Sequence, residues 1–315
     1  MTQTRRRILV TGGAGFIGSH LVPHLLELGH SVTVLDNLSF GKMANLNGVL
    51  DHPKFLFQRG DITDKALPKA VFDGVDSVIH LAALIDISAS VANPIQNHEV
   101  NVNGTFNMLQ AAVKHGVKKF VFASSTAVYG DAKTLPLREN IALNPISPYA
   151  ASKIAGEAYC SAYASCFGLE VTALRFFNIY GSRSENSSYS GVITAFLKKT
   201  VRDEGLTIDG DGEQTRDFIH VSDVVKAVTI ALERKEGLKS EVFNVCTGVP
   251  TSINQLADTL KEISGKKLKV KHGPARVGDI RSSYGDPAKA AENLGFRAAV
   301  DLKQGLQMLL EEFKK

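Results

Sequence analysis

The stretch that decides the fold is RILVTGGAGFIGSHL, residues 7–21. A short apolar run, typical of a buried strand, leads into Gly12, Gly15 and Gly18 and then into a helical pattern. Glycines at this spacing allow a tight turn, a close approach of the backbone to a pyrophosphate, and anion binding at a helix N-terminus. A glycine-rich turn alone is weak evidence, but here a strand precedes it and a helix follows it. The stretch therefore predicts a dinucleotide-binding turn.

Apolar runs alternate with helical patterns along the following chain. Further strands are expected in SVTVLD, KFLFQRGD, SVIHLAA, KKFVFASS and EVTALRFFN, and long helices from about 94 to 115 and from 148 to 167. Strands that are apolar throughout are expected when helices cover both faces of a parallel sheet. The order predicts an α/β fold with a Rossmann-type doubly wound parallel sheet.

The identity of the dinucleotide follows from the end of the second expected strand. Asp36 lies near the ~20-residue offset at which a carboxylate meets the adenosine ribose. This carboxylate would repel a 2′-phosphate, which favours NAD over NADP, although the neighbouring Lys42 can tolerate that phosphate. Asp61 and Ile62, at the end of the third strand, are well placed for the adenine.

Two units are expected. Residues 1–176 should form the NAD-binding Rossmann domain, and residues 177–315 a smaller C-terminal lobe that binds the substrate, while a strand near 241–246 should rejoin the first sheet. Further helices are expected near 191–204, 222–234, 252–264 and 302–314. Pro23 lies inside the first helix, where a proline costs about 3 kcal/mol, and no sequence pattern shows what compensates for it.

A tyrosine and a lysine in NPISPYAASKIAGEAY are the first candidates for chemistry. Ser147 and Pro148 are a typical N-cap and first helical residue, so Tyr149 and Lys153 should share a helix face. A phenol with a pKa of about 10 is protonated at neutral pH. A nearby ammonium and the helix N-terminus would both favour its ionised form, so the pair indicates a lysine that lowers the pKa of a catalytic tyrosine.

The same spacing recurs at Tyr129 and Lys133, which shows that spacing alone decides little. Gly130 and Asp131 follow Tyr129 and indicate a loop rather than a helix. Only the pair at 149 and 153 is therefore expected to act.

Together these features resemble the extended short-chain dehydrogenase/reductase family over nearly the whole chain. The motifs that carry the resemblance are TGGAGFIG, HLAA, NVNGT, ASSTAVYG, YAASK, RFFNIYG and RDFIHV. Within the family the chain is most similar to the branch of nucleotide-sugar 4-epimerases. The resemblance implies bound NAD, a UDP-sugar substrate, and a homodimer formed through the two long helices.

The resemblance also implies roles for individual residues. The catalytic residues would be Tyr149, Lys153, Ser125 and Thr126. NAD would be bound by Gly12, Gly15, Phe16, Ile17, Gly18, Asp36, Asn37, Lys42, Asp61, Ile62, Leu81, Ala82, Ala83, Asn101, Ser124, Tyr149, Lys153 and Phe177. The UDP-sugar would be bound by Ser125, Thr126, Tyr149, Asn178, Arg216, Arg276, Asp279 and Ser283.

The implied reaction inverts C4 of a UDP-hexose, either UDP-glucose or UDP-galactose, through a transient 4-keto sugar. Tyr149 would take the proton of the 4-hydroxyl while C4 gives a hydride to NAD⁺, and the hydride would return to the opposite face. Related dehydratases and decarboxylases need carboxylates after the Ser/Thr, where this chain has Thr126 and Ala127. Because the cofactor ends as it began, it should stay tightly bound.

Three alternatives stay open. Ser283, where a bulkier residue often narrows the pocket, indicates room for N-acetylhexosamines, while Ile85 replaces a usual lysine and leaves the donors near the sugar unassigned. A UDP-glucuronate 4-epimerase would use an arginine of YGSRSE, Arg183, although Glu185 would oppose its charge. A non-catalytic regulator that binds NAD or a nucleotide sugar is the third.

Composition excludes other classes. The 315 residues carry 36 basic and 32 acidic side chains, a net charge of +4 that is too small to indicate nucleic acid. No apolar run approaches the ~20 residues that span a bilayer. The three cysteines lack metal-ligand spacing, so no metal is expected and a reducing cytoplasm fits.

Overall fold

The structure is a computed structural model that describes residues 5–65, 69–184, 191–234, 240–276 and 278–314. Its centre is a seven-stranded sheet in the order β11-β6-β5-β4-β1-β2-β3, and every neighbouring pair is parallel. The strands are β1 (Arg7–Thr11), β2 (Ser31–Asp36), β3 (Phe55–Arg59), β4 (Ser77–His80), β5 (Lys119–Ser125), β6 (Glu170–Phe176) and β11 (Ser240–Val245). This is the Rossmann-like α/β architecture that the apolar runs predict.

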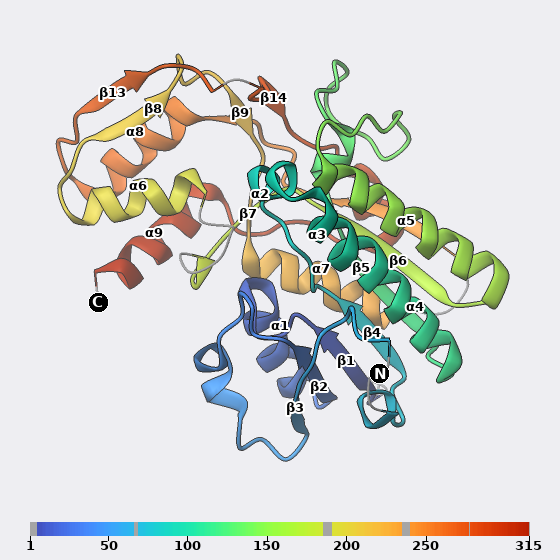
Figure 1. Cartoon of the computed structure of the whole chain (residues 1–315). Helices are drawn as coiled ribbons and strands as arrows, with labels where there is room; N and C mark the ends of the chain where they lie inside the picture. Colours follow the sequence, from blue (N-terminus) through green and yellow to red (C-terminus); the bar gives the residue numbers. More distant parts are fainter. Residues whose placement is uncertain (1–4, 66–68, 185–190, 235–239, 277, 315) are drawn as a thin grey trace.

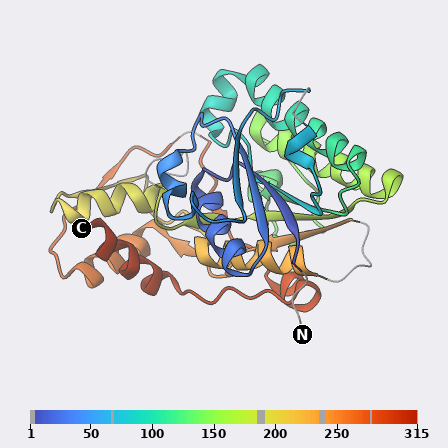
Figure 2. The same ribbon diagram turned by 90° about the horizontal axis from the view of Figure 1, so that it is seen from below.

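Helices cover both faces of the sheet, so the core has three layers (Figure 2). One face carries α1 (Phe16–Glu27) and α7 (Val221–Glu233); the other carries α4 (Gly104–Lys114) and α5 (Pro148–Phe167). Successive residues of β1 alternate between the layers: Ile8 and Val10 belong to the first core, and Leu9 to the second. Burial on both sides explains why these strands lack polar alternation.

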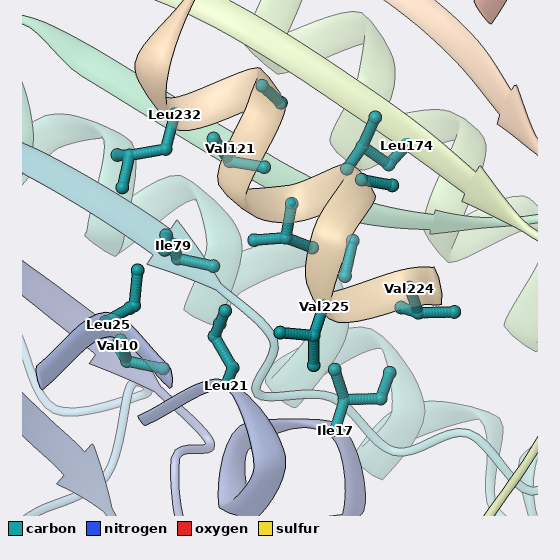
Figure 3. Packing of buried hydrophobic residues seen from close by; sticks show 14 of the residues in the cluster. Val10, Ile17, Leu21, Leu25, Ile79, Val121, Leu174, Val224, Val225 and Leu232 are labelled. Carbon is teal, nitrogen blue, oxygen red and sulfur yellow. The ribbon is translucent and has the colours of Figure 1, made fainter. Parts of the chain in front are cut away.

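The packing of α1 and α7 against the sheet is visible in Figure 3. Leu21 and Leu25 of α1 and Val225 of α7 approach Ile79 of β4 and Val121 of β5, and all five side chains are buried. The helix α7 therefore belongs to the sheet layers, although it lies far along the chain. The strand β11 likewise pairs with β6 along its whole length, Ser240↔Val171 to Val245↔Phe176.

The remaining elements form a smaller lobe beyond the carboxyl ends of the strands (Figure 1). Its core lies among α6 (Val192–Val201), α8 (Ile253–Ser264) and α9 (Leu302–Phe313), beside the parallel pair β8 (Leu206–Asp209) and β13 (Val270–Gly273). Short strands join the two parts: β7 (Asn178–Tyr180), β9 (Thr215–Arg216), β10 (Phe218–His220), β12 (Thr251–Ser252) and β14 (Ser282–Ser283). The sheet layers do not end at residue 176, the expected boundary, because α7 and β11 come later in the chain and belong to these layers.

The helical patterns predict their positions within a few residues. The run expected at 94–115 consists of α3 (Pro94–His98), a π-helical segment (Glu99–Asn103) and α4, and it follows α2 (Ile87–Ala92). The other short helical segments are η1 (Met43–Val49), η2 (Lys69–Phe72), η4 (Thr126–Tyr129) and η6 (Ala290–Leu294).

The structure shows what compensates for Pro23. A proline cannot donate to the carbonyl four residues earlier, which here is that of Ser19. Arg183 donates from Nη1 to this carbonyl at 2.8 Å and to the Asn45 carbonyl at 3.4 Å. A side chain 164 residues away therefore satisfies the acceptor that Pro23 leaves open.

Candidate active site

The glycine turn lies between the carboxyl ends of β1 and β4, where the strand order reverses, and doubly wound sheets bind ligands at such a crevice. Gly12 has φ +71°, and a Cβ there would lie 2.8 Å from the Ala82 nitrogen. At Gly18 a Cβ would lie 2.5 Å from the Gly12 oxygen. Gly15 is the N-cap of α1 and has no side chain to cap it, so the helix N-terminus is open to an anion.

Three polar side chains support this turn, and no sequence motif indicated their role. They belong to Thr11, His80 and Thr105. His80 lies between the Thr11 hydroxyl (Nδ1, 2.7 Å) and the Thr105 hydroxyl (Nε2, 3.1 Å). Thr105 donates its own proton to the Asn101 carbonyl at 2.6 Å, so Nε2 of His80 must be the protonated nitrogen. Burial, with a smaller effect of the Lys153 charge, lowers the pKa of His80 to about 3. The imidazole is neutral and ties β1, β4 and α4 together.

Two carboxylates lie at the carboxyl ends of β2 and β3, those of Asp36 and Asp61. Asp36 is buried and accepts from the Ala14 amide at 3.0 Å and the Leu38 amide at 2.8 Å. Burial raises its pKa, against the effect of these two bonds. Asp61 is more open: burial works against its ionisation, but bonds from Thr63 and Asn37 lower its pKa overall. Both carboxylates lie beside the glycine turn.

A cavity of about 230 Å³ joins these parts. Twelve of the residues expected to bind NAD line it: Gly12, Gly15, Phe16, Ile17, Gly18, Asp36, Asn37, Asp61, Ile62, Leu81, Ala82 and Ala83. Gly41, Leu84, Gln96 and Val100 also line it and had no sequence signal of their own. The glycine motif and the strand ends thus converge on one cleft.

Lys42 and Asn101 are not among the residues that line this cavity. The backbone of Lys42 donates to the Ala14 carbonyl at 3.1 Å, and its side chain is exposed. Asn101 is buried; its side chain bonds to both the amide and the carbonyl of Leu84 at 2.8 Å, and to Ser152 at 3.1 Å. The amide of Asn101 therefore holds the loop after β4, a role of support behind the cleft.

Tyr149 and Lys153 lie on the buried face of α5, one turn apart. The helix begins at Pro148, and the Ser147 hydroxyl accepts from the Ala150 amide at 3.1 Å. Lys153 Nζ donates to the Ala123 carbonyl at 2.8 Å and lies 5.9 Å from the centroid of the Tyr149 ring. The Tyr149 hydroxyl is hydrogen-bonded to the side chain of Ser125. Ser125, Tyr149 and Lys153 therefore meet at the carboxyl end of β5.

The electrostatics of this pair differ from the sequence expectation. Burial raises the pKa of Tyr149 to about 12, although the Ser125 bond works in the other direction. Burial lowers the pKa of Lys153 to about 8, against the charge of Glu157. Neither group is among the causes of the other's pKa shift, and Lys153 donates to the Ala123 carbonyl. In the protein alone, Lys153 does not lower the pKa of the phenol.

Tyr129, the other tyrosine with a lysine four residues later, is in a 3₁₀ turn and fully buried. Its hydroxyl donates to Asn244 Oδ1 at 2.6 Å and accepts from Arg175 Nη1 at 2.9 Å. Lys133 is exposed and pairs with Asp131. Gly130 and Asp131 lie outside any helix or strand, as expected, so Tyr129 and Lys133 share no helix face.

A second cavity, of about 700 Å³, opens between the sheet and the smaller lobe. It is lined by all eight residues expected to bind the UDP-sugar: Ser125, Thr126, Tyr149, Asn178, Arg216, Arg276, Asp279 and Ser283. Ser124 and Phe177, expected at the cofactor, lie here too, and Ile85 lines both cavities, which therefore adjoin.

The charged groups of this cavity are paired with one another. Arg216 Nη2 donates to Asp279 Oδ1 at 2.5 Å, and Arg276 Nε to Asp209 Oδ2 at 2.6 Å. Ser283 lies opposite Arg216 in the pairing of β14 with β9. Thr126 Oγ1 is buried beside Ser125 and has no hydrogen-bond partner. The cavity thus offers planar guanidinium donors suited to phosphate.

Comparison with known proteins defines the class. Residues 8–246 match the NAD dependent epimerase/dehydratase family, and the chain belongs to it. The UDP-glucose 4-epimerase of Mycolicibacterium smegmatis is 39% identical over 310 residues, 98% of each chain. The structure is similar to a UDP-glucose 4-epimerase of Thermotoga maritima with UDP-glucose, with a TM-score of 0.91, 40% identity and 98% of each chain covered. It is also similar to a UDP-N-acetylglucosamine 4-epimerase of Methanobrevibacter ruminantium in complex with UDP-N-acetylmuramic acid, with a TM-score of 0.92, 36% identity and 98% of each chain covered.

The protein is therefore an NAD-dependent isomerase of the extended short-chain dehydrogenase/reductase type. The residues present fit the cofactor. The uncapped N-terminus of α1, the close approach of Gly12 to Ala82 and the buried Asp36 match a pyrophosphate and an adenosine ribose. No helix of the described residues is long and apolar enough to cross a membrane. The described part of the chain holds no cluster of three His, Cys, Asp or Glu that could bind a metal.

Proposed function

We propose that this protein is a UDP-hexose 4-epimerase that interconverts UDP-glucose and UDP-galactose. The observation that carries the proposal is the meeting of Ser125, Tyr149 and Lys153 at the carboxyl end of β5, where Ser125 and Tyr149 line the larger cavity. A proton-transfer group must be within hydrogen-bond reach of the hydroxyl it serves. Tyr149 and Lys153 are the titratable members of this group, and of these two Tyr149 lines the larger cavity.

Each residue has a distinct part in the proposed reaction. The Tyr149 oxygen receives the proton of the sugar 4-hydroxyl and returns it, while Ser125 orients both oxygens. Lys153 supplies a positive charge to the phenolate from the same helix face. When bound, NAD supplies the hydride acceptor for C4 and the positive charge of its nicotinamide. Because burial raises the pKa of Tyr149 to about 12, the tyrosine needs such positive charge to give up its proton.

Binding of the nucleotide is assigned to the smaller lobe. In this proposal Arg276 meets the phosphates and Asp279 the ribose, while Asn178 and Arg216 meet the diphosphate or the nucleoside. The carboxylates of Asp279 and Asp209 hold the two guanidinium groups before a ligand arrives. If most of the affinity comes from this end, the sugar is free to turn over between the two half-reactions.

The structure favours the neutral sugars over UDP-glucuronate. Arg183, the candidate for a carboxylate, donates instead to the Ser19 and Asn45 carbonyls. Glu185, which would oppose its charge, lies outside the described residues. Ser283 is small, 8% exposed and on the cavity wall, which supports acceptance of N-acetylhexosamines as well. The regulator alternative is disfavoured because the catalytic group is complete.

One substrate panel tests the proposal. The purified protein is incubated with UDP-galactose, UDP-N-acetylgalactosamine and UDP-glucuronate, with and without added NAD⁺, and the products are separated by chromatography. We expect conversion of UDP-galactose, weaker or comparable conversion of the N-acetyl sugar, and little of the glucuronate. Conversion of none of the three would refute an epimerase of UDP-hexoses, and a preference for glucuronate would refute the substrate assignment.

We also propose that the protein acts in the cytoplasm as a homodimer. All three cysteines are free, and two of them are buried, as expected where disulfides do not form. The outer side of α4 and α5 carries an aromatic row, in which Phe106 contacts Tyr159 at 5.2 Å between ring centroids. Tyr159 is 39% exposed and Phe167 59%, which supports a partner on this side.

A further inference from the structure

A buried ion pair lies directly behind the catalytic group. Glu157 is one helical turn after Lys153 on α5, and its carboxylate accepts from Arg175 Nε at 2.9 Å and Nη2 at 2.7 Å. The side chains of Glu157 and Arg175 are only 9% and 4% exposed. The same carboxylate also accepts from the Ser124 hydroxyl. The substrate and cofactor roles described above do not use this pair.

The ion pair is part of a network that joins five elements, α5, β5, β6, η4 and β11. Arg175, on β6, also donates from Nη1 to the Tyr129 hydroxyl at 2.9 Å and to the Glu139 carbonyl at 3.2 Å. Tyr129 in turn donates to Asn244 of β11 at 2.6 Å. Pairs that are buried and bidentate fix geometry more strongly than exposed ones. A substitution of Glu157 would therefore disturb the contacts among α5, β5 and β6.

The network bears on the reaction through three consecutive residues of β5. The carbonyl of Ala123 receives Lys153, the hydroxyl of Ser124 binds Glu157, and the side chain of Ser125 binds the Tyr149 hydroxyl. Three side chains of α5 thus contact the end of β5. Tyr149 and Lys153 contact Ser125 and Ala123, and Glu157 contacts Ser124 between them.

We propose that Glu157 is a positioning residue for the reaction, whose carboxylate fixes the end of β5 against α5 and supplies the negative charge that faces the Lys153 ammonium. This inference rests on the proposed function. It assigns to a residue outside both cavities the task of keeping the Ser125–Tyr149 bond and the cation of Lys153 in place.

The charges around Lys153 support this assignment. Burial lowers the pKa of Lys153 to about 8, and Glu157 and Cys160 are the groups that oppose this fall. Burial raises the pKa of Cys160 far above neutrality, so its thiol carries no charge. His80, which faces Lys153 from β4, is neutral because burial lowers its pKa to about 3.

Arg175 pairs with the Glu157 carboxylate from β6, and burial raises the pKa values of the Tyr149 and Tyr129 phenols to about 12. Both phenols are therefore neutral near pH 8. Of the two described groups that favour the charged form of Lys153, the thiol of Cys160 is neutral, which leaves the carboxylate of Glu157. Its removal should lower the pKa of Lys153 further, because a buried ammonium without a counter-charge loses its proton more readily.

The test is Glu157→Gln, which keeps the shape and loses the charge. Lys153 is followed by NMR of the protein labelled with ¹³C at lysine Cε, with the resonance assigned from Lys153→Met. We expect a titration midpoint near pH 8 in the wild type and one about one pH unit lower in Glu157→Gln. In parallel, the alkaline limb of kcat for UDP-galactose should move down by about one unit, a roughly fivefold loss at the pH of the original midpoint that approaches tenfold at higher pH.

Glu170→Gln is the matched control. Glu170 of β6 pairs with Lys119 of β5 at 3.1 Å, at the amino ends of these two strands. Loss of this pair should lower stability without moving the midpoint of the Lys153 titration or that of kcat. Glu157→Asp, which keeps the charge and shortens the reach, should retain the midpoint and lose kcat with little change in KM. This second variant also decides the matter should Glu157→Gln fold poorly.

The outcomes separate the two proposals. An unchanged Lys153 midpoint in Glu157→Gln, or an equal shift in Glu170→Gln, overturns the role of Glu157. A wild-type protein that converts no UDP-sugar contradicts the proposed function instead, and the NMR midpoints still decide whether Glu157 sets the charge of Lys153.

Discussion

Two tyrosines, Tyr129 and Tyr149, precede a lysine by four residues. Removing the hydroxyl of each in turn tests the catalytic assignment. Tyr149→Phe removes a hydroxyl that lines the sugar cavity and bonds to Ser125. Tyr129→Phe removes a hydroxyl that is buried between Asn244 and Arg175. Both changes keep the ring, so they differ in what the hydroxyl does. We expect the first to remove activity and the second to remove stability.

The magnitudes follow from the two environments. General acid–base catalysis contributes about 10²–10⁴-fold, so Tyr149→Phe should lose at least that factor in kcat. Its stability should change by only about 1 kcal/mol, the net worth of one hydrogen bond. Tyr129→Phe leaves the Asn244 oxygen without its donor and Arg175 Nη1 with the Glu139 carbonyl alone. An unsatisfied buried polar group costs about 1–3 kcal/mol.

Three measurements on each variant are sufficient: kcat for UDP-galactose, the free energy of unfolding in urea, and the nicotinamide content of the purified protein. Tyr149→Phe should retain nicotinamide and unfold near the wild-type denaturant concentration while being inactive. Tyr129→Phe should unfold earlier and keep most of its kcat. Equal losses of kcat in the two variants, or substantial activity in Tyr149→Phe, would refute the reasoning.

Three further predictions concern the cofactor, the substrate and the assembly. Gly18→Ala places a Cβ 2.5 Å from the Gly12 oxygen, and such overpacking costs about 1–3 kcal/mol. Bound nicotinamide should therefore fall roughly tenfold to hundredfold. Gly48→Ala is the control, because a Cβ there has nothing within 4 Å, and this variant should retain bound nicotinamide. Ser283→Tyr should lower kcat/KM for UDP-N-acetylgalactosamine by about tenfold to hundredfold and spare UDP-galactose; an unchanged ratio would show that Ser283 does not meet the sugar. Light scattering at micromolar concentration should give a dimer mass, and Tyr159→Glu on α5, but not Met308→Glu at a more exposed position on α9, should shift it toward the monomer; a monomer mass for the wild type contradicts the proposed dimer.

The parts of the fold that sequence analysis predicted are those with a local signature. The apolar runs of the seven strands and the glycine spacing after β1 are such signatures, and both agree with the structure. The N-cap of α5 at Ser147 was predictable because a serine before a proline at a helix start has a direct physical reason. These local rules are sufficient to place Tyr149 and Lys153 on one buried face.

The parts that sequence analysis missed depend on contacts between distant residues. The bond from Arg183 to the carbonyl left open by Pro23 spans 164 residues, and the network around Arg175 joins residues from five elements. No periodicity records such partners. The same limit applies to Tyr149: the pattern shows a lysine nearby, but the burial that raises the pKa of the phenol to about 12 comes from the tertiary packing.

The central claim is that the protein inverts C4 of a UDP-hexose by removing the hydrogen of that carbon and returning the same hydrogen to its other face. The most direct measurement uses UDP-galactose with deuterium at C4, incubated in ordinary water with the purified protein and no added reductant, and locates the label in the product by NMR. We expect UDP-glucose with deuterium retained at C4. Loss of the label to solvent, or no UDP-glucose even with added NAD⁺, would contradict it.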